Sequence, residues 1–431
     1  MDSLWSEGMH LPQRKMLEQD AKTDVLIIGG GIAGILCAYR LQQAGVDYML
    51  VEAERICSGI TKNTTAKITV QHGLIYDKLI RQAGTERARM YLEVNELALR
   101  DYVQLCREID CSFEEKDSYV YSRNDRDLIE KEIRALEKLG RCAEFSLADE
   151  LPFAVAAAVK MPRQAQFHPL KFLSAIAKDL NLYENTKVCE LIGNRAITNR
   201  GTITAEKMIA TTHFPFLNKH GSYFIKQYQH RSYVIAYANA QQMDGMYVDE
   251  QKKGMSFRAY DDLLLIGGGS HRTGKKGGNW QELSEFADRY YPRAKETFRW
   301  ATQDCMTLDG VPYIGRYSAR TSDFYVATGF NKWGMTSSMA AARILTDMVL
   351  GRNSEFAEVF SPSRSMFHPQ LLINGAEAVV NLLTPSGKRC PHLGCALKWN
   401  PQERSWDCPC HGSRFDEDGT LIDNPATGDL T

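Results

Sequence analysis

The chain lacks the features expected of a nucleic-acid-binding or membrane-spanning protein. Its 431 residues include 52 lysines and arginines against 53 aspartates and glutamates, so neither charge predominates. This balance gives no electrostatic reason to expect binding to nucleic acid or to an anionic membrane. The longest uncharged apolar run, Val25–Tyr39, is too short to span a bilayer and is interrupted by four glycines.

A secretory signal is also lacking, because the first residues, MDSLWSEGMHLPQRK, do not place a basic stretch before an apolar one. We therefore expect a cytoplasmic protein, in which most of the 11 cysteines would be thiols or metal ligands. Cysteines are sparse along most of the chain but cluster near its end, at Cys390, Cys395, Cys408 and Cys410. The length predicts two to four domains.

Residues 24–52 have the pattern of a strand, a glycine turn, a helix and a second strand. The strands are predicted at Asp24–Ile28 and Tyr48–Val51, and the helix at Ile32–Ala44. The turn between the first strand and the helix carries Gly-x-Gly-x-x-Gly. This order of elements is typical of the first βαβ unit of a dinucleotide-binding fold.

Each glycine of this motif has a physical role in dinucleotide binding. Gly29 allows the tight turn, Gly31 lets the backbone approach a pyrophosphate, and Gly34 permits close packing of helix on strand. The helix N-terminus then faces the phosphates with its partial positive charge. Glu52, at the end of the second strand, can accept a hydrogen bond from a ribose hydroxyl.

Three further segments favour FAD over NAD. Arg55–Lys67 resembles the loop that runs along pyrophosphate and flavin in enzymes of the glycine oxidase and D-amino-acid oxidase group. Leu308–Gly315 and Gly329–Met335 resemble the C-terminal flavin-contacting segments of the same group, although the second could also be a glycine turn that packs Trp333 into a core. The motif and this resemblance together assign cofactor contacts to Gly29, Gly31, Ala33, Gly34, Glu52, Arg55, Thr61, Thr65, Lys67, Val188, Gly315, Gly329, Lys332, Trp333, Gly334 and Met335.

The C-terminal cysteines form a second motif with two histidines. Cys390-x-His392 is followed after fifteen residues by Cys408-x-x-His411. Two cysteines and two histidines suit a tetrahedral zinc ion, and a purely structural disulfide knot is a further alternative. Zinc sites rarely leave an additional cysteine beside each ligand pair, however, and the pattern resembles the two ligand boxes of a Rieske protein nearly residue for residue.

The Rieske resemblance implies a role for each residue of the motif. Cys390 and Cys408 would bind one iron of a 2Fe–2S cluster, and His392 and His411 the other. It further implies a disulfide between Cys395 and Cys410, a hydroxyl from Ser413 to a cluster sulfur, and a covering loop at residues 424–426. Phe415 stands where high-potential members often carry tyrosine, so we expect a potential below the top of the Rieske range of about −150 to +300 mV.

Taken together, residues 22–431 resemble bacterial FAD-dependent oxidoreductases of the glycine/D-amino-acid oxidase type with a C-terminal Rieske domain. The resemblance implies an α/β fold, with an FAD-binding Rossmann-like domain, an antiparallel-sheet substrate domain and a small all-β Rieske domain. We expect the FAD domain at 22–80, 141–220 and 300–352, the substrate domain at 81–140 and 221–299, a linker at 353–365 and the Rieske domain at 366–431. The last segment is short, so the main body must cover part of it.

The expected reaction follows from these two cofactors. FAD would accept a hydride from a small substrate such as an amine or amino acid, and the cluster would pass electrons singly to an external ferredoxin-like protein or quinone. Lys332 and Arg258 are the candidate catalytic residues, and Arg231, Tyr233 and Tyr260 lie in the region that grips substrate in this group. The alternatives are an electron-transfer or redox-sensing module without turnover, and an oxygen-dependent oxidase with an accessory cluster.

One further expectation concerns Ile266–Gly274, IGGGSHRTG. Its glycines are misplaced for a second dinucleotide motif, so the segment is predicted to be a turn, with His271 at the surface.

Overall fold

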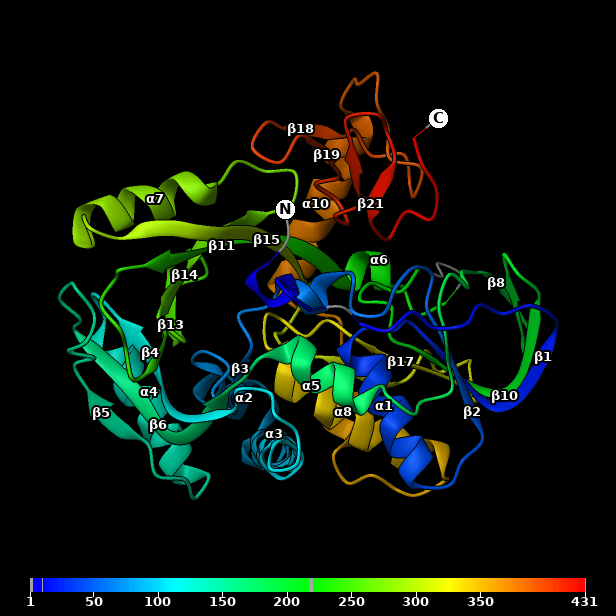
Figure 1. Ribbon diagram of the computed structural model, residues 1–431, viewed down its shortest axis with the longest axis horizontal. Helices are drawn as coiled ribbons and strands as arrows, with labels where there is room; N and C mark the ends of the chain where they lie inside the picture. Colours follow the sequence, from blue (N-terminus) through cyan, green and yellow to red (C-terminus); the bar gives the residue numbers. More distant parts are fainter. Residues whose placement is uncertain (1–2, 10, 217–219, 431) are drawn as a thin grey trace.

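The computed structural model describes residues 3–9, 11–216 and 220–430, which form three β-sheets (Figure 1). The first sheet has a parallel centre with strand order β17–β10–β1–β2–β7 and an antiparallel edge strand, β16. Its strands are β1 (Ala21–Ile28), β2 (Tyr48–Val51), β7 (Leu182–Tyr183), β8 (Val188–Ile192), β9 (Arg195–Thr198), β10 (Thr202–Ala210), β16 (Tyr313–Arg316) and β17 (Phe324–Thr328). This is the sheet that the N-terminal motif predicted.

Helices α1 (Ile32–Gln43), α5 (Pro169–Ile176) and α8 (Gly334–Val349) belong with this sheet. Alanines on α1 and α8, among them Ala38 and Ala341, are fully buried and allow the two helices to pack closely. The predicted helix at Ile32–Ala44 therefore agrees with α1 to within one residue at each end.

The second sheet is mixed and lies beside the first. Its strands are β3 (Lys67–Ile68), β4 (Glu114–Ser122), β5 (Glu144–Ser146), β6 (Ala157–Gln166), β11 (Gln227–Ala238), β12 (Met246–Asp249), β13 (Ser256–Tyr260), β14 (Leu263–Arg272) and β15 (Lys295–Thr307). Strands β13, β14, β11 and β15 pair antiparallel, in agreement with the antiparallel sheet expected of the substrate domain. Helices α2 (Ile75–Ala83), α3 (Thr85–Cys106), α4 (Arg126–Lys138) and α7 (Asn279–Tyr290) complete the main body.

Two expectations for this sheet are wrong. The predicted turn at Ile266–Gly274 is strand up to Arg272, because β11 pairs with β14 as far as Arg272, and β13 pairs with its other edge as far as Gly267. This pairing outweighs the weak strand preference of the glycines. His271 is consequently buried, with its ring stacked on that of Tyr233 at a centroid distance of 5.6 Å.

The segment 353–365 is packed against the main body. Within it, α9 (Ala357–Phe360) buries Phe360 against Tyr91, and Arg364 forms an ion pair with Asp309 at 2.6 Å. The expected linker thus leads the chain along a defined path to the C-terminal segment, which we define as residues 366–430.

The C-terminal segment begins with a helix and ends in an antiparallel sheet. The sheet contains β18 (Lys398–Asn400), β19 (Ser405–Asp407), β20 (Arg414–Asp416) and β21 (Leu421–Asp423). The helix, α10 (Pro369–Leu383), precedes it and was not expected from the sequence, which suggested turns. Figure 1 shows both elements above β11 and β15, and the short helix α6 (Tyr223–Lys226) lies nearby. Among the described residues, the helices are too short or too polar to cross a membrane.

Candidate functional site

A cavity of about 890 Å³ lies between the first sheet and the second. Residues at the carboxyl ends of β1, β2, β10 and β17 form one wall, and β11 and β15 contribute the opposite wall. Ligands of open parallel sheets bind outside the carboxyl ends of the strands. The cavity is therefore in the position that the N-terminal motif predicts for a dinucleotide.

Most of the predicted cofactor residues line this cavity. They are Gly29, Gly31, Ala33, Glu52, Arg55, Thr61, Thr65, Lys67, Val188, Gly329, Lys332, Trp333, Gly334 and Met335. Gly34 and Gly315 are not part of the lining. Gly34 instead sits where α1 meets β1, and Gly315 lies on β16 facing Pro362. The structure thus gathers residues from distant segments around one cavity.

The glycine turn leaves no room for side chains. A Cβ at Gly29, whose φ is 111°, would lie 2.8 Å from the carbonyl oxygen of Thr211, and a Cβ at Gly34 would lie 1.9 Å from that of Gly29. The Gly30 amide donates a hydrogen bond of 2.6 Å to Glu52, which holds that carboxylate at the end of β2. The turn, the start of α1 and Glu52 form a cradle suited to a nucleotide.

The loop after β2 is held in place from behind. Arg55 lines the cavity and also forms an ion pair with Glu184 at 2.9 Å. Arg258 is completely buried and donates hydrogen bonds to the carbonyl oxygens of Thr65 at 2.7 Å and Ala66 at 3.0 Å. Burial, and then the Arg258 charge, lower the pKa of Lys67 to about 7. Arg258 is not in the cavity lining, so this placement indicates that it positions the loop.

The loop before α8 carries Lys332, whose ammonium group reaches strand β14. The Lys332 ammonium donates to the Ser270 hydroxyl at 3.0 Å, which lies 3.2 Å from the Ser232 hydroxyl. Ser232 in turn donates to Asp304 at 3.1 Å. Burial lowers the pKa of Lys332, and the Asp304 carboxylate acts in the opposite direction. A chain of hydrogen bonds therefore connects this lysine with an acid across the cavity wall.

Three histidines that line the cavity, His72, His213 and His230, escaped the sequence analysis. His72 stacks on Trp333 with ring centroids 5.1 Å apart, and burial lowers its pKa to about 3. His230 lies opposite Asp304 in the β11–β15 register, and burial followed by the Lys332 charge lowers its pKa to about 2. The imidazoles of His72 and His230 are therefore neutral at physiological pH. For His230, the available signal was the alternation of residues 227–233, but so polar a stretch is compatible with a strand and with a turn.

Strand alternation gives β11 and β15 two different faces. Ser232 and Asp304 face the cavity, whereas Arg231 and Gln303, one residue away, face the C-terminal segment. The Gln303 amide donates a hydrogen bond of 2.9 Å to the carbonyl oxygen of Gly412. In this region, one layer of sheet thus separates the cavity from the loop that carries Cys408 and His411.

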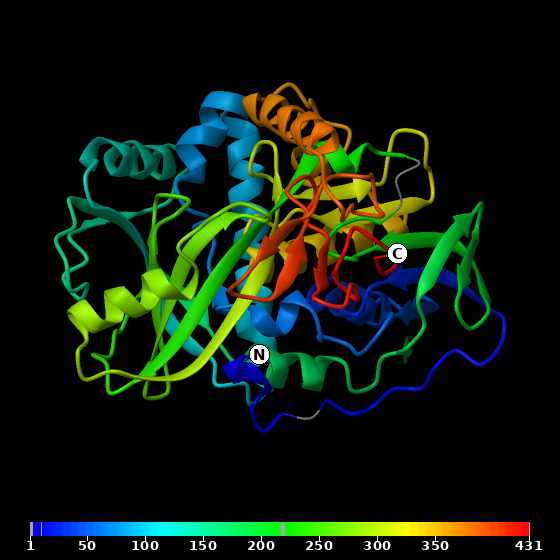
Figure 2. The ribbon, with the colours of Figure 1, turned by 90° about the horizontal axis from the view of Figure 1, so that it is seen from above.

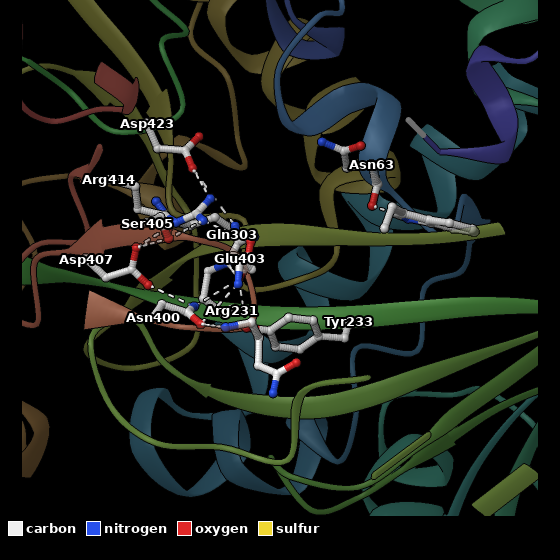
Figure 3. A network of polar contacts seen from close by, with 12 residues as sticks. Asn63, Arg231, Tyr233, Gln303, Asn400, Glu403, Ser405, Asp407, Arg414 and Asp423 are labelled. Atoms are coloured by element: carbon white, nitrogen blue, oxygen red, sulfur yellow. Dashed lines mark hydrogen bonds and ion pairs between the residues drawn. The ribbon is translucent and has the colours of Figure 1, made fainter. Parts of the chain in front are cut away.

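Buried ion pairs fasten the C-terminal segment to this sheet (Figure 3). Glu403 forms an ion pair with Arg231, accepts a hydrogen bond from the Tyr233 hydroxyl at 2.7 Å, and pairs with Arg414 at 2.9 Å. Burial raises the pKa of Glu403, but the two guanidinium groups more than offset this and lower it to about 2. Arg231, expected near substrate, therefore serves the contact between the two parts of the chain. Tyr233 serves the same contact and also lines the cavity.

The four predicted cluster ligands come together at this contact. Cys390 and Cys408 are buried with their thiols within hydrogen-bonding reach, and the rings of His392 and His411 lie 5.0 Å apart. Burial lowers the pKa of His392 to about 4 and that of His411 to about 3, which keeps both imidazoles neutral and able to bind metal.

The structure contains the implied disulfide and places the implied covering loop beside these ligands, and the bond from Ser413 to a cluster sulfur stays a prediction. Cys395 and Cys410 form a disulfide that joins the two ligand loops. The Ser413 hydroxyl accepts a hydrogen bond of 3.0 Å from the Ala426 amide, which places the loop 424–426 over the site. Asn424 donates to the carbonyl oxygens of Thr212 at 2.7 Å and Phe214 at 2.9 Å, so this loop also reaches the main body.

Comparison with known proteins defines the class of this chain. Residues 24–348 match the family described as FAD dependent oxidoreductase, and residues 372–431 match the Rieske [2Fe-2S] domain. The chain therefore belongs to the FAD-dependent oxidoreductase family and carries a C-terminal Rieske domain. It binds FAD through the first part and a 2Fe–2S cluster through the second.

A relative of similar organisation is the putative Rieske 2Fe-2S iron-sulfur protein YhfW of Bacillus subtilis (strain 168). It is 34% identical over 491 aligned positions, which cover 99% of this chain and 96% of the relative. Because this chain has only 431 residues, the relative contains at least 60 that have no counterpart here. The cytochrome b6-f complex iron-sulfur subunit 3 of Nostoc sp. is 51% identical over 37 residues, 9% of this chain and 21% of that protein.

Solved structures confirm the fold of the main body. Glycine oxidase from Geobacillus kaustophilus superposes with a TM-score of 0.68 at 19% identity, covering 80% of this chain and 99% of that one. L-proline dehydrogenase from P. horikoshii gives 0.67 at 19% identity, covering 80% and 98%. The predicted oxidoreductase class and the α/β fold with a small β-domain are therefore confirmed.

The residues present fit both cofactors. The close packing at Gly29 and Gly34 holds the β1–α1 turn in the form that dinucleotide-binding folds use, and Gly29 and Gly31 line the cavity without side chains. In the Rieske domain, the Nδ1 atom of His411 is buried without a hydrogen-bond partner among the described residues, as expected of a metal ligand. The flanking cysteines are tied in the disulfide, so Cys390 and Cys408 are the thiols of the two ligand boxes that stay free to bind iron.

Proposed function

We propose that this protein oxidises a small amine or amino acid by hydride transfer to FAD and passes the electrons singly, through the Rieske cluster, to an external acceptor. The observation that carries the proposal is the shared wall of β11 and β15. Asp304 lines the FAD cavity, while its neighbour Gln303 is bonded to Gly412, which directly follows the ligand His411. Such short connections favour transfer within the chain.

A second connection between the two sites also supports electron transfer between the two cofactors. Thr212 lines the FAD cavity, and its carbonyl oxygen accepts the hydrogen bond from Asn424 on the loop that covers the cluster. Residues 421–424 of the Rieske domain themselves line the cavity. The two cofactor sites are therefore neighbours, and an accessory cluster remote from the flavin has no support in this arrangement.

The chain's own residues would bind and orient the substrate. Of the described residues that line the cavity, Arg55 is the only arginine, and it pairs with Glu184. A substrate carboxylate would thus be held by a lysine, and Lys332, on the predicted flavin loop, is our candidate. When bound, FAD supplies the hydride acceptor. Lys332 would supply positive charge where negative charge develops during its reduction, and we assign Arg258 the supporting role described above.

The reduction potentials of Rieske clusters and of ferredoxins limit which proteins can accept the electrons. A plant-type ferredoxin lies near −400 mV, well below the Rieske range of about −150 to +300 mV. Such a ferredoxin is a poor acceptor from this cluster, so we propose an acceptor of higher potential. The cytoplasmic location remains a prediction.

The test compares the wild-type protein with the variant His411→Ala under anaerobic conditions. Candidate amines and amino acids are added, and flavin bleaching and the cluster's paramagnetic signal are followed in parallel. We expect the wild-type flavin to bleach first and the cluster to become reduced afterwards. The variant should keep FAD and bleach, but lose both the cluster signal and electron delivery to a one-electron acceptor protein.

The alternatives predict different results in the same experiment. If no donor bleaches the flavin, the protein is an electron-transfer module without turnover. If the variant delivers electrons to the acceptor protein as fast as the wild type, the cluster is not on the path.

A further inference from the structure

Helix α10 is amphipathic, but its polar face points inward. Asn374 and Asn381 are its buried residues, and together with Glu377 they recur at the spacing of one helical face. The Asn374 side chain accepts a hydrogen bond of 2.9 Å from Arg272 on β14 and donates one of 3.0 Å to the carbonyl oxygen of Ile225. This face holds the helix on the main body.

The same polar face contacts both ligand loops of the cluster. The carbonyl oxygen of Asn381 accepts a hydrogen bond of 2.9 Å from the Ala396 amide, next to the disulfide cysteine Cys395. The carbonyl oxygen of Glu377 lies 3.9 Å from the Cys410 sulfur. Helix α10 therefore lies between the cluster loops and the surface, along one edge of the molecule (Figure 2).

The opposite face of α10 is apolar and exposed. We call it the apolar face of α10; it consists of Leu372, Ile373, Val379, Val380 and Leu383. Leu372 and Leu383 are each 77% exposed, far more than isolated leucines of a folded surface usually are. Leu393, between the ligand His392 and the glycine that follows, is exposed as well and extends the apolar surface to the cluster loop.

The size of this face argues against a permanent partner. A helix of 15 residues is about 22 Å long, and a strip about 10 Å wide along it covers only about 220 Å². A standard stable interface requires about 800 Å² from each partner. Short-lived complexes of electron-transfer proteins lie at the low end of interface size, so the face suits a transient partner better than a second copy of this chain.

The C-terminal end of this face carries a basic rim: Arg389 donates hydrogen bonds to the carbonyl oxygens of Leu382 and Thr384. Between Met366 and Asn400 the sequence contains Lys388, Arg389 and Lys398, and Glu377 is its only carboxylate. That carboxylate is paired with Lys275 at 2.7 Å. A basic rim around an apolar centre attracts a partner with negative charges around its own apolar centre.

We propose that the apolar face of α10 is the docking site of a small acidic one-electron carrier protein, which accepts electrons from the Rieske cluster. The inference rests on the proposed function and names the partner of the same site. In each transfer one electron leaves the cluster, whose ferrous iron becomes ferric, and the metal of the carrier is reduced by one electron. The apolar contact and the basic rim determine which carrier is used.

The experiment measures this transfer without any substrate. The full-length protein is reduced with dithionite, freed of excess reductant and mixed in a stopped-flow instrument with a plastocyanin-type acidic blue-copper protein. A basic c-type cytochrome is used in parallel. We expect faster transfer to the acidic carrier, with a rate that falls as salt is raised. Val379→Gln combined with Leu383→Gln should slow that transfer about tenfold.

A matched control and a small acceptor make the result specific. Leu147, which follows β5 in the main body, is also exposed, and Leu147→Gln should leave the rate unchanged. Ferricyanide needs no protein docking, so the double variant should reduce it at the wild-type rate. Equal rates to acidic and basic carriers, or an unaffected double variant, would overturn the proposal.

Two other occupants of the face would be recognised by further measurements. If sedimentation shows a wild-type dimer that the double variant loses, the face is a contact between copies. If the wild type binds vesicles of anionic lipid and the variant does not, the face is a membrane contact. Either result overturns the carrier proposal. Failure of the proposed function would look different, because no donor would then bleach the flavin while dithionite-driven transfer remained.

Discussion

At the scale of single residues, the loop before α8 shows how backbone conformation positions a functional group. Asn331 and Lys332 have positive φ angles of 51° and 74°, a region that non-glycine residues rarely occupy. The Asn331 side chain compensates by accepting a hydrogen bond of 2.8 Å from the Thr307 amide. The loop is thereby held so that Lys332 reaches across the cavity to Ser270.

The first residue-scale prediction concerns the charge of Lys332. We expect Lys332→Met to slow anaerobic flavin reduction about 100-fold, because a single positioned donor contributes about this much to charge stabilisation. Because burial lowers the pKa of Lys332, the wild-type rate should fall with rising pH below the usual lysine value of about 10.4. The variant should lack this limb of the pH profile.

The control is Lys253→Met, an exposed lysine outside the cavity lining. Its rate and pH profile should match the wild type. An unchanged high-pH limb in Lys332→Met would show that another group titrates there.

At the scale of elements, β11 illustrates how one strand serves two sites. Ser232 faces the FAD cavity, and the adjacent Arg231 and Tyr233 bind Glu403 of the Rieske domain. A shift in register by one residue would exchange these two sets of side chains. The pairing of β11 with β14 and β15 on both edges therefore determines which residues reach which cofactor.

A pair of helical glycines provides a prediction at the same scale. Gly34→Ala should abolish FAD retention and destabilise the fold, because its Cβ would overlap the carbonyl oxygen of Gly29. Gly375→Ala, in α10, meets no atom within 4 Å and should stabilise the protein by up to about 1 kcal/mol through helix propensity. Thermal unfolding and the FAD absorbance of the purified proteins measure both effects. A Gly34→Ala protein with full FAD content would contradict the predicted close packing.

At the scale of the whole molecule, buried charges hold the Rieske domain on the main body. Glu403 and Arg231 are less than 10% exposed, and Arg414 links the same carboxylate to Asp407 and Asp423. Removal of one member of such a network leaves its partners charged and without compensation in a buried site. The position of the cluster therefore depends on ion pairs that span the two domains.

We predict that Glu403→Gln lowers the free energy of unfolding by about 3–5 kcal/mol and makes the Rieske domain more sensitive to proteolysis. Glu417→Gln is the matched control, because its ion pair with Arg404 is exposed and contributes at most about 1 kcal/mol. Chemical denaturation of both variants measures the difference, and equal losses would disprove a special role of Glu403.

The same carboxylate predicts a pH dependence. The pKa of Glu403 is about 2 in the folded protein, below the usual glutamate value of about 4.3. Its contribution to stability is therefore complete above that usual value and is lost as the pH falls towards 2. The wild type should lose stability over this range more steeply than Glu403→Gln.

Local patterns in the sequence were sufficient to predict both cofactors. The glycines of the first turn, Glu52 and the Rieske boxes are short-range signals, because strand, turn and helix or two compact loops produce each site. The same locality explains why helix α1 was predicted to within one residue. Helix α10 was missed because its outward apolar face and inward asparagines reverse the usual pattern.

The sequence by itself therefore determined the two kinds of cofactor and the order of the FAD-dependent oxidoreductase and Rieske domains. Only the tertiary structure decided that His72, His230 and Asp304 share one cavity, that Arg231 faces the Rieske domain, and that one sheet separates the two cofactor sites. The physical reason is that these relations depend on pairing and packing between segments far apart in the chain. A strand's two faces can be read from alternation, but which partner covers each face is established only when the whole chain has folded.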